Sequence, residues 1–427
     1  MLSSRSSLSE WLTRLESFSP HEIELGLDRV KAVLERLALP KPNHVLLVGG
    51  TNGKGSSVAM LEAILLRQGA STGTYTSPHV VDFNERICID GMPAPDNEIV
   101  AAFERVESAR DGVPLTYFEY GTLAALAVFA AHDVDYVILE VGMGGKLDAV
   151  NAVEPDASLI TNVSLDHCDW LGNDIETIAR EKAGIMRPER PVIFASAQVP
   201  DSIVEIADEL QADLRLARRD YDWTLTDDGR WNWSGRDCSL DALSPPGLRG
   251  EFQFGNAAGA LALLEAAGLG ERLDRDEVSD ALAATSLMGR MQEIETDRHW
   301  LLDVAHNPAA AHVLAETVGS GGDDGTTVAI VAMLDDKDVE SSSVLLDSVV
   351  DRWIAVTADS SRAIPAAELG RIIANVTNKG CLVADSLEEA LDFARGLTKP
   401  DDRVLITGSF YLVGPALYIL AGLGTDA

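Results

Sequence analysis

Residues 44–57 form a glycine-rich segment that contains Lys54 and, two positions later, Ser56. The apolar run before the glycines predicts a buried strand, and the apolar residues after Ser56 predict a helix. In such a strand, glycine turn and helix, backbone N–H groups and the helix N-terminus bind phosphates. The lysine reaches the terminal phosphates, and a serine hydroxyl can bind Mg²⁺. Because Gly55 breaks the strict spacing, a βα turn without a ligand is the alternative to a nucleotide site.

Three further candidate ligands follow apolar runs that predict strands. Glu140 ends the run that begins at Tyr136, and glycines that allow a ligand to approach closely come directly after it. Ser77 and His167 hold comparable positions after two other runs. Open α/β sheets bind ligands at the carboxyl ends of their strands, so these side chains could bind one or two divalent ions. A solvated strand end and a structural histidine are the alternatives.

Lys182 falls on the apolar side of a predicted helix over residues 174–186. It continues the stripe of Ile175, Ile178 and Ala179 at helical spacing. A buried ammonium is costly unless it is paired, neutral or modified. A neutral buried amine could take up CO₂ and become a carbamate, which is an anionic metal ligand. The alternative is a side chain that extends to the surface.

Asp303 and His306 form a second candidate pair, just past a predicted strand in the later part of the chain. Asn307 and Pro308 then force a turn. Three residues apart, the acid and the histidine could face a ligand in the cleft between two domains. A structural Asp–His turn is the alternative.

Apolar strand-like runs alternate with helix-like segments over most of the chain, which predicts an α/β fold. We expect a P-loop-type, mostly parallel sheet in an ATPase domain, residues 1–290, followed by a smaller Rossmann-like α/β domain, residues 291–427. The boundary falls within 286–298. Residues 219–250, rich in Asp, Gly, Trp and Pro, predict antiparallel hairpins.

The composition is strongly acidic, with a formal net charge of −34 over 427 residues. Binding of nucleic acid or of an anionic membrane through a basic surface is therefore not expected. The acidic residues are spread along the chain, and 8 lysines stand against 26 arginines. This pattern is typical of a halophilic cytoplasm, where acidic surfaces maintain solubility, and an ordinary acidic enzyme is the alternative.

Four scattered cysteines without a CxxC pair predict neither a zinc site nor disulfides. The N-terminus lacks a signal-peptide pattern, and the longest apolar stretch, residues 410–424, contains Pro415 and is shorter than a membrane span. We therefore expect a soluble cytoplasmic protein that is a monomer.

Taken together, the motifs resemble the Mur ligase superfamily and, within it, the folylpolyglutamate synthase/dihydrofolate synthase family. The resemblance covers nearly the whole chain. It is carried by residues 50–56, 75–79, 83–87, 116–119, 140–149, 165–167, 181–185, 289–290, 303–308 and 407–409. It implies ATP-dependent amide formation: ATP phosphorylates a substrate carboxylate, and the amino group of L-glutamate attacks the acyl phosphate. The implied acceptors are dihydropteroate and tetrahydrofolate, and the implied cofactors are ATP and Mg²⁺, as two ions.

The resemblance also implies residue roles. The implied ATP-binding residues are Thr51, Asn52, Gly53, Lys54, Gly55, Ser56, Asn256 at the adenine, Arg290 at the phosphates and Asp303 at the ribose. The implied Mg²⁺ ligands are Ser56, Ser77, Glu140, His167 and a carbamylated Lys182. The implied catalytic residues are Lys54, Lys182, His167 and His306, the last near the glutamate or the phosphate. The implied pterin side comprises Glu24, Leu25, Phe118, Glu119, Leu147, Asp148 and Ala149.

Residues 21–28 resemble the loop that binds dihydropteroate in bifunctional members, which favours a bifunctional enzyme. Three positions depart from the family pattern: Lys146, Val150 and Phe252 stand where arginine, threonine and histidine are usual. One alternative is a Mur-type ligase that acts on a non-folate carboxylate, although such a protein would carry an N-terminal UDP-sugar domain ahead of the phosphate loop. The other is a nucleotide-dependent switch without catalysis.

Overall fold

The computed structural model describes residues 7–18, 26–320 and 325–422. The described chain divides into two compact units, and each is considered by itself. The first unit comprises residues up to 163 together with 175–247 and 254–285. The second comprises 164–174, 248–253 and the residues from 286 onward. The sequence prediction of a boundary within 286–298 did not include the two short segments.

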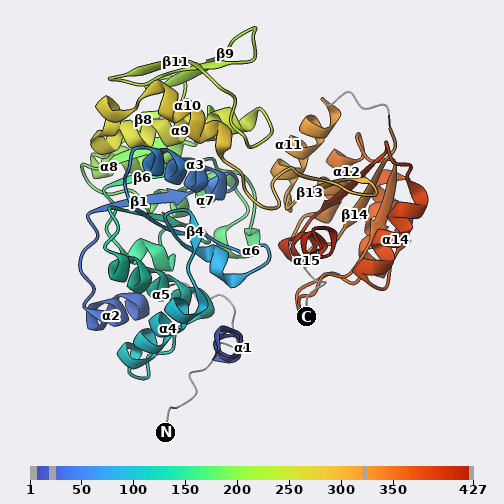
Figure 1. The fold of residues 1–427 in the computed structure, drawn as a ribbon, viewed down its shortest axis with the longest axis horizontal. Coiled ribbons are helices and arrows are strands. Elements are labelled where there is room, and N and C mark those ends of the chain that lie inside the picture. The colour runs from blue at the N-terminus through green and yellow to red at the C-terminus, as the bar shows by residue number, and fades with distance from the viewer. Residues whose placement is uncertain (1–6, 19–25, 321–324, 423–427) are drawn as a thin grey trace. The chain divides into compact units, whose positions relative to one another are not determined.

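The first unit is built on an eight-stranded sheet in the order β4-β3-β2-β5-β1-β6-β7-β8 (Figure 1). The strands are β1 His44–Gly49, β2 Thr72–Tyr75, β3 Ile87–Ile89, β4 Met92–Pro93, β5 Tyr136–Glu140, β6 Ala157–Ile160, β7 Pro191–Phe194 and β8 Asp213–Leu216. All neighbours from β2 to β8 pair in parallel, and β3 and β4 add an antiparallel edge.

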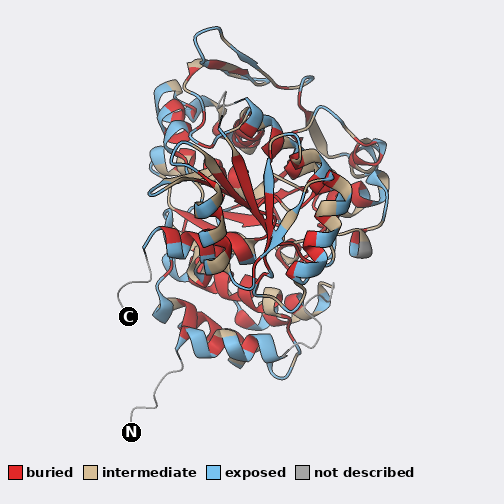
Figure 2. Cartoon of the chain, turned by 90° about the vertical axis from the view of Figure 1, so that its right-hand side faces the viewer, coloured by how far each residue is buried: buried red, intermediate tan, exposed pale blue. Residues whose placement is uncertain are grey.

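Helices cover both faces of this sheet, with α3 and α10 on one side and α4 and α5 on the other (Figure 1). The helices are α1 Leu8–Phe18, α2 Asp28–Leu37, α3 Lys54–Arg67, α4 Asp96–Arg110, α5 Tyr117–His132, α7 Ile175–Ala183, α8 Asp201–Leu210, α9 Phe252–Leu264 and α10 Arg275–Ala284. Because both faces are covered, strands such as β1 and β5 are apolar on both sides and are buried almost throughout. Figure 2 shows that buried residues gather in the strands, whereas the helices and loops carry most of the exposed residues.

A separate three-stranded antiparallel sheet consists of β9 Asp222–Leu225, β10 Trp231–Ser234 and β11 Ser239–Leu243. The hairpins predicted for residues 219–250 are therefore confirmed. Trp231 and Trp233 on β10 are buried, and the indole nitrogens donate to Ser244 O and Ala258 O. These contacts satisfy the polar atom of each large side chain while its ring is removed from water.

The second unit contains a six-stranded sheet in the order β12-β13-β17-β14-β15-β16, parallel except for β12. Its strands are β12 Gln292–Glu295, β13 His299–Asp303, β14 Thr327–Val331, β15 Arg352–Ala355, β16 Cys381–Val383 and β17 Arg403–Thr407. Its helices are α6 Cys168–Leu171, α11 Pro308–Gly319, α12 Val339–Leu346, α13 Ala366–Thr377, α14 Leu387–Leu397 and α15 Phe410–Leu420.

The predicted architecture, a mostly parallel α/β sheet followed by a smaller α/β unit, is confirmed. Five strands were not predicted: β3, β4, β8, β12 and β16. They are short and lie at or next to sheet edges, and none has the long apolar run that marks the central strands. All four cysteines are free. Within the described parts of the chain, no helix has the length and apolar character needed to cross a membrane.

Candidate active site

The phosphate loop joins β1 to α3 at the carboxyl end of the central strand, as predicted. Gly50 and Gly53 have φ of +136° and +85°, a region that disfavours side chains. A Cβ at Gly50 would lie 1.9 Å from Thr161 Oγ1, and one at Gly53 would lie 2.6 Å from Asn256 Oδ1. Glycine is therefore required at both positions, and Asn256 lies directly against the loop.

The loop is held in shape by the segment that follows β6, a feature that the sequence analysis missed. Asn162 accepts from Asn52 N through Oδ1 at 3.1 Å and donates through Nδ2 to Asn52 O at 3.0 Å. The hydroxyl of Thr161 donates to Asn52 O at 2.6 Å, and Thr51 N donates to Asn162 O at 3.0 Å. The sequence did hold a signal for these two residues, because Thr161 ends a predicted strand, as Glu140 does, and Asn162 follows directly. The strand β6 pairs with β1, which sets them beside the loop.

Two lysines meet at this loop. Lys54 Nζ donates to Gly50 O at 3.2 Å and to Thr51 O at 3.1 Å. Lys182 Nζ, from α7, donates to the same Gly50 oxygen at 3.0 Å. Lys182 is only 3% exposed, so the alternative of a side chain that extends to the surface is wrong. The tertiary fold thus brings a second amine to the loop from a segment 132 residues away in sequence.

Oxygen donors suited to a divalent ion gather at the same sheet edge. The register of β1 and β5 sets Glu140 beside Val48, and Ser77 follows the neighbouring strand β2. Ser77 N donates to Glu140 Oε2 at 3.0 Å, and Glu140 is 5% exposed. Ser56, in the first turn of α3, is also buried. Hydroxyl and carboxylate oxygens of this kind are the ligands that Mg²⁺ prefers, so the residues present fit such an ion.

The residues expected on the pterin side are partly brought together around Gly142. A Cβ at Gly142 would lie 2.7 Å from the Phe118 ring and 3.2 Å from Asp148 Oδ2, so both side chains meet there. The Asp148 carboxylate accepts from Met143 N at 2.9 Å and from Val150 N at 3.1 Å. Burial raises the pKa of Asp148 to about 7 despite these hydrogen bonds.

The other predicted pterin-side residues differ in their burial and in their contacts. Glu119 is buried, forms an ion pair with Arg29 at 2.9 Å and accepts from Thr116 N at 2.7 Å in a capping box. Its oxygens therefore hold α2 and the first turn of α5 in place. Leu147 is 38% exposed and Ala149 is buried beside Asp148 in a short 3₁₀ turn. Glu24 and Leu25 lie outside the described residues.

In the second unit, the end of β13 presents the predicted acid and histidine. Asp303 accepts from Ala305 N at 2.8 Å and from Met291 N at 2.9 Å, and burial raises its pKa. His306 Nδ1 donates to Val304 O at 2.8 Å, which leaves Nε2 directed elsewhere. The guanidinium of Arg290 lies 5.2 Å from the centre of the Phe410 ring.

A buried ionic cluster links three segments of this unit. Lys337 Nζ lies 2.8 Å from Asp166 Oδ1 and 3.1 Å from Asp336 Oδ2, and the Lys337 and Asp166 side chains are 6% and 7% exposed. Asn307 Nδ2 donates to Asp166 Oδ2 at 2.9 Å, and His306 Nε2 lies 3.6 Å from the same oxygen. Burial favours a raised pKa for Asp166, but the hydrogen bond from His306 and the nearby cationic groups lower it instead.

His167, a predicted metal ligand, belongs to the second unit by its contacts. Its Nδ1 lies 3.6 Å from Asp336 Oδ2, and it adopts a left-handed backbone conformation with φ of +52°. Its neighbour Asp166 is the centre of the ionic cluster.

The sequence analysis did not single out Lys337. A lone lysine among the acids of residues 335–338, just past the strand β14, was the available signal.

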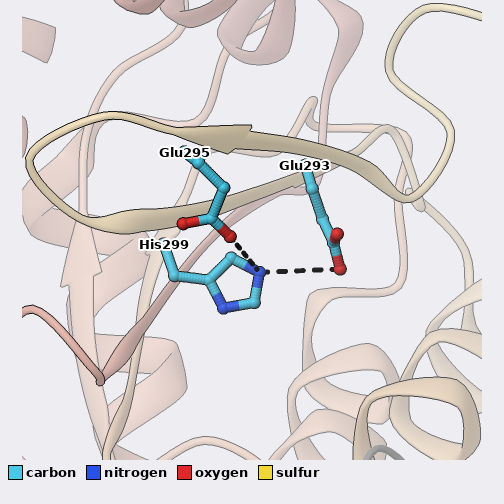
Figure 3. A group of neighbouring side chains, drawn as sticks. All are labelled: Glu293, Glu295 and His299. Atoms are coloured by element: carbon cyan, nitrogen blue, oxygen red, sulfur yellow. Dashed lines mark ion pairs between the residues drawn. The ribbon is translucent and has the colours of Figure 1, made fainter.

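A group of two carboxylates and one imidazole lies on the β12–β13 hairpin of the second unit (Figure 3). His299 Nε2 is 3.5 Å from Glu293 Oε1 and 3.6 Å from Glu295 Oε1. Arg249 forms an ion pair with the same Glu293 oxygen. Because an arginine already compensates this exposed acidic group and would repel a cation, the hairpin is a surface ion-pair network rather than a metal centre.

Comparison with known proteins agrees with this geometry. The family model for the Mur ligase middle domain matches residues 48–211, and that for the Mur ligase, glutamate ligase domain matches residues 289–410. A dihydrofolate synthase/folylpolyglutamate synthase of Escherichia coli strain K12 is 39% identical over 416 residues, which are 97% of this chain and 96% of that protein.

Two solved structures have the same fold over nearly all of their length. E. coli FolC in complex with DHPP and ADP is 38% identical, covers 98% of both chains and gives a TM-score of 0.92. The bifunctional folylpolyglutamate synthase/dihydrofolate synthase of Yersinia pestis complexed with AMPPNP and Mn ion is 37% identical, covers 97% of this chain and 98% of that one, and gives a TM-score of 0.89. This chain therefore belongs to the dihydrofolate synthase/folylpolyglutamate synthase family of Mur-type ligases.

Proposed function

We propose that this protein is an ATP-dependent ligase that joins L-glutamate to the carboxylate of dihydropteroate, of a tetrahydrofolate, or of both. The observation that carries the proposal is the meeting of Lys54 and buried Lys182 at the Gly50 carbonyl of the phosphate loop. A simple nucleotide switch has no need of a second, buried amine at that place. Family membership supplies the substrate class.

The phosphate loop and its neighbours would bind the nucleotide. Backbone N–H groups of residues 51–56 and the N-terminus of α3 would hold the phosphates, with Lys54 moving from its carbonyl partners to the terminal phosphate. Asn256 lies against the loop and would contact the adenine side. Arg290 and Asp303 would bind phosphate and ribose.

The proposed metal ligands are Ser56, Ser77, Glu140, His167 and Lys182 as a carbamate. A bound Mg²⁺ would offset the charge that develops on the transferring phosphoryl group. The carbamate would form when the neutral Lys182 amine adds to CO₂ and releases one proton. Its burial away from water is the property that favours the neutral amine which this addition needs.

The reaction would proceed in two steps. A carboxylate oxygen of the acceptor attacks the terminal phosphorus of ATP, and the bond from that phosphorus to ADP breaks. The glutamate amine then attacks the acyl carbon, loses a proton, and expels inorganic phosphate to give the amide. His306 has Nδ1 engaged by Val304 O and Nε2 at 3.6 Å from Asp166 Oδ2, and Nε2 would leave that carboxylate to meet the incoming amine or the leaving phosphate.

The test is ADP release with Mg-ATP and L-glutamate, offering dihydropteroate and tetrahydrofolate separately in high salt. Turnover with both acceptors means a bifunctional enzyme, and turnover with tetrahydrofolate alone means a polyglutamate synthase. Turnover with neither contradicts the folate assignment and favours another Mur-type acceptor. ADP release that needs neither acid nor amine would favour a switch. Two predictions from the sequence also remain to be tested. Size-exclusion chromatography would test whether the protein is a monomer, and a binding assay would test whether it lacks affinity for nucleic acid.

Replacement of Lys182 tests the role of the buried amine. We expect Lys182→Ala to lower ADP release by at least about a hundredfold, since it removes a proposed metal ligand. The thermal unfolding midpoint should change little. Lys379→Ala, which removes a lysine that pairs with Asp347 in the second unit, is the matched control and should keep full turnover. Full activity of Lys182→Ala would contradict the carbamate hypothesis.

A further inference from the structure

Arg86 is a buried cation that no carboxylate of the described chain neutralises. It is 9% exposed, at the end of the 3₁₀ turn Phe83–Arg86, and it forms no ion pair with any described Asp or Glu. Other arginines with largely buried side chains differ: Arg29 pairs with Glu119, and Arg215 pairs with Asp213 and Glu265. In a chain with twice as many acidic as basic residues, an unpaired buried guanidinium is unexpected.

The protein contacts of Arg86 leave most of its donors unused. Its Nε donates to His79 Nδ1 at 2.8 Å. Because His79 Nδ1 accepts this hydrogen bond, that nitrogen carries no proton, so the imidazole is a neutral partner and does not compensate the cation. The guanidinium lies 5.6 Å from the centre of the Phe83 ring and 5.4 Å from that of Tyr117. Its two terminal nitrogens make no hydrogen bond to any described residue.

The main chain sets Arg86 beside the proposed metal ligands. Its carbonyl accepts from Thr76 N at 2.9 Å, and the next residue, Ser77, donates to Glu140. The residue after Tyr117 is Phe118, whose ring lies 5.7 Å from that of Tyr75. Arg86 is therefore tied on one side to the loop of Ser77 and stacked on the other against the first residues of α5, which carry the proposed pterin side.

We infer that Arg86 binds the carboxylate of the acyl acceptor and determines that the acceptor must be an anion. The inference rests on the proposed function. A planar guanidinium with free terminal nitrogens can bind both carboxylate oxygens at once. The aromatic rings of Phe83 and Tyr117 hold it in one orientation. A positive group here would also offset the repulsion between the acceptor carboxylate and the ATP phosphates.

The experiment compares Arg86→Met and Arg86→Lys with wild type. We expect Arg86→Met to raise the KM for dihydropteroate or tetrahydrofolate about 10- to 100-fold, the range for loss of a charge-assisted hydrogen-bonded pair. The KM for ATP and for glutamate should stay within about twofold. Arg86→Lys should be intermediate, since it keeps the charge but not the planar pair of donors. Arg218→Met, which removes an arginine stacked on Trp223, is the control and should change none of these constants.

Direct binding separates this inference from the proposed function, because it needs no turnover. Pteroate and its neutral carboxamide would be titrated into each variant and followed by tryptophan fluorescence. Wild type should prefer the carboxylate, and Arg86→Met should lose that preference while binding the carboxamide as before. Equal loss of both ligands would mean that Arg86 only supports the local structure. An altered KM for ATP alone would assign Arg86 to the nucleotide phosphates, and either result overturns the inference.

Discussion

Replacement of Lys337 by methionine should destabilise the second unit by about 3 kcal/mol. The ammonium lies 2.8 Å from Asp166 and 3.1 Å from Asp336, and Lys337 and Asp166 have side chains only 6% and 7% exposed. Removal of one partner from a buried ion pair typically costs about 3–5 kcal/mol, because the remaining charge stays desolvated. We expect the lower end, since Asn307 and His306 still face Asp166 and Asp336 is 14% exposed.

Urea unfolding followed by tryptophan fluorescence measures this cost. Lys379→Met is the matched control, because Lys379 is 34% exposed and pairs with Asp347 at 2.9 Å. A partly solvated pair of that kind should be worth about 1 kcal/mol or less. The double variant Lys337→Met with Asp166→Asn removes one of the two uncompensated carboxylates, so it should recover part of the loss. If Lys337→Met costs no more than Lys379→Met, the cluster does not stabilise this unit as argued.

Three further changes have expected outcomes. Gly50→Ala should weaken binding of an ATP analogue at least about tenfold, because the new Cβ would lie 1.9 Å from Thr161 Oγ1. Calorimetry measures this affinity. The control is Gly396→Ala, which has open space around the new Cβ and should bind the analogue as wild type does. Burial lowers the pKa of His79 to about 4 in the folded protein, against about 6.5 in the unfolded chain. As the pH falls from 6.5 toward 4, the unfolded chain binds a proton that the folded protein does not bind. The free energy of unfolding should therefore fall by about 3 kcal/mol over this range. His79→Gln should lack that part of the pH dependence of urea unfolding, and identical curves would contradict it. Finally, turnover and the thermal midpoint should rise up to molar KCl if the −34 charge is a halophilic adaptation, and full activity in dilute buffer would reject that interpretation.

Local pattern was sufficient for the central elements of the fold. Apolar runs such as Tyr136–Leu139 predicted strands because a strand covered by helices on both faces must be apolar on both. The edge strands β8 and β12 are polar, so they carry no apolar run and were not predicted. They form strands because a neighbouring strand pairs with them, not because of their own composition. The spacing of Lys182 predicted a buried amine, and the structure confirms the burial.

The partners of the candidate residues could not be predicted from the pattern. Asp166 and Lys337 are 171 residues apart, and nothing in either segment signals the other. The ion pair of Glu119 with Arg29 also joins segments that no local pattern connects. A motif places a residue at a strand end or on a helix face, whereas its hydrogen-bond partners come from chain segments that only the folded sheet brings near.

The sequence by itself determined the phosphate loop, the mostly parallel α/β architecture and the kinship with folate ligases, because each of these depends on contiguous residues and their spacing. Only the tertiary structure decided that Lys182 reaches the Gly50 carbonyl, that Asn162 shapes the phosphate loop and that Arg86 stays without a carboxylate partner. These features depend on the order of strands in the sheet and on which charges share a desolvated space. Both are properties of the packed chain, since the cost of a buried charge exists only once water has been excluded.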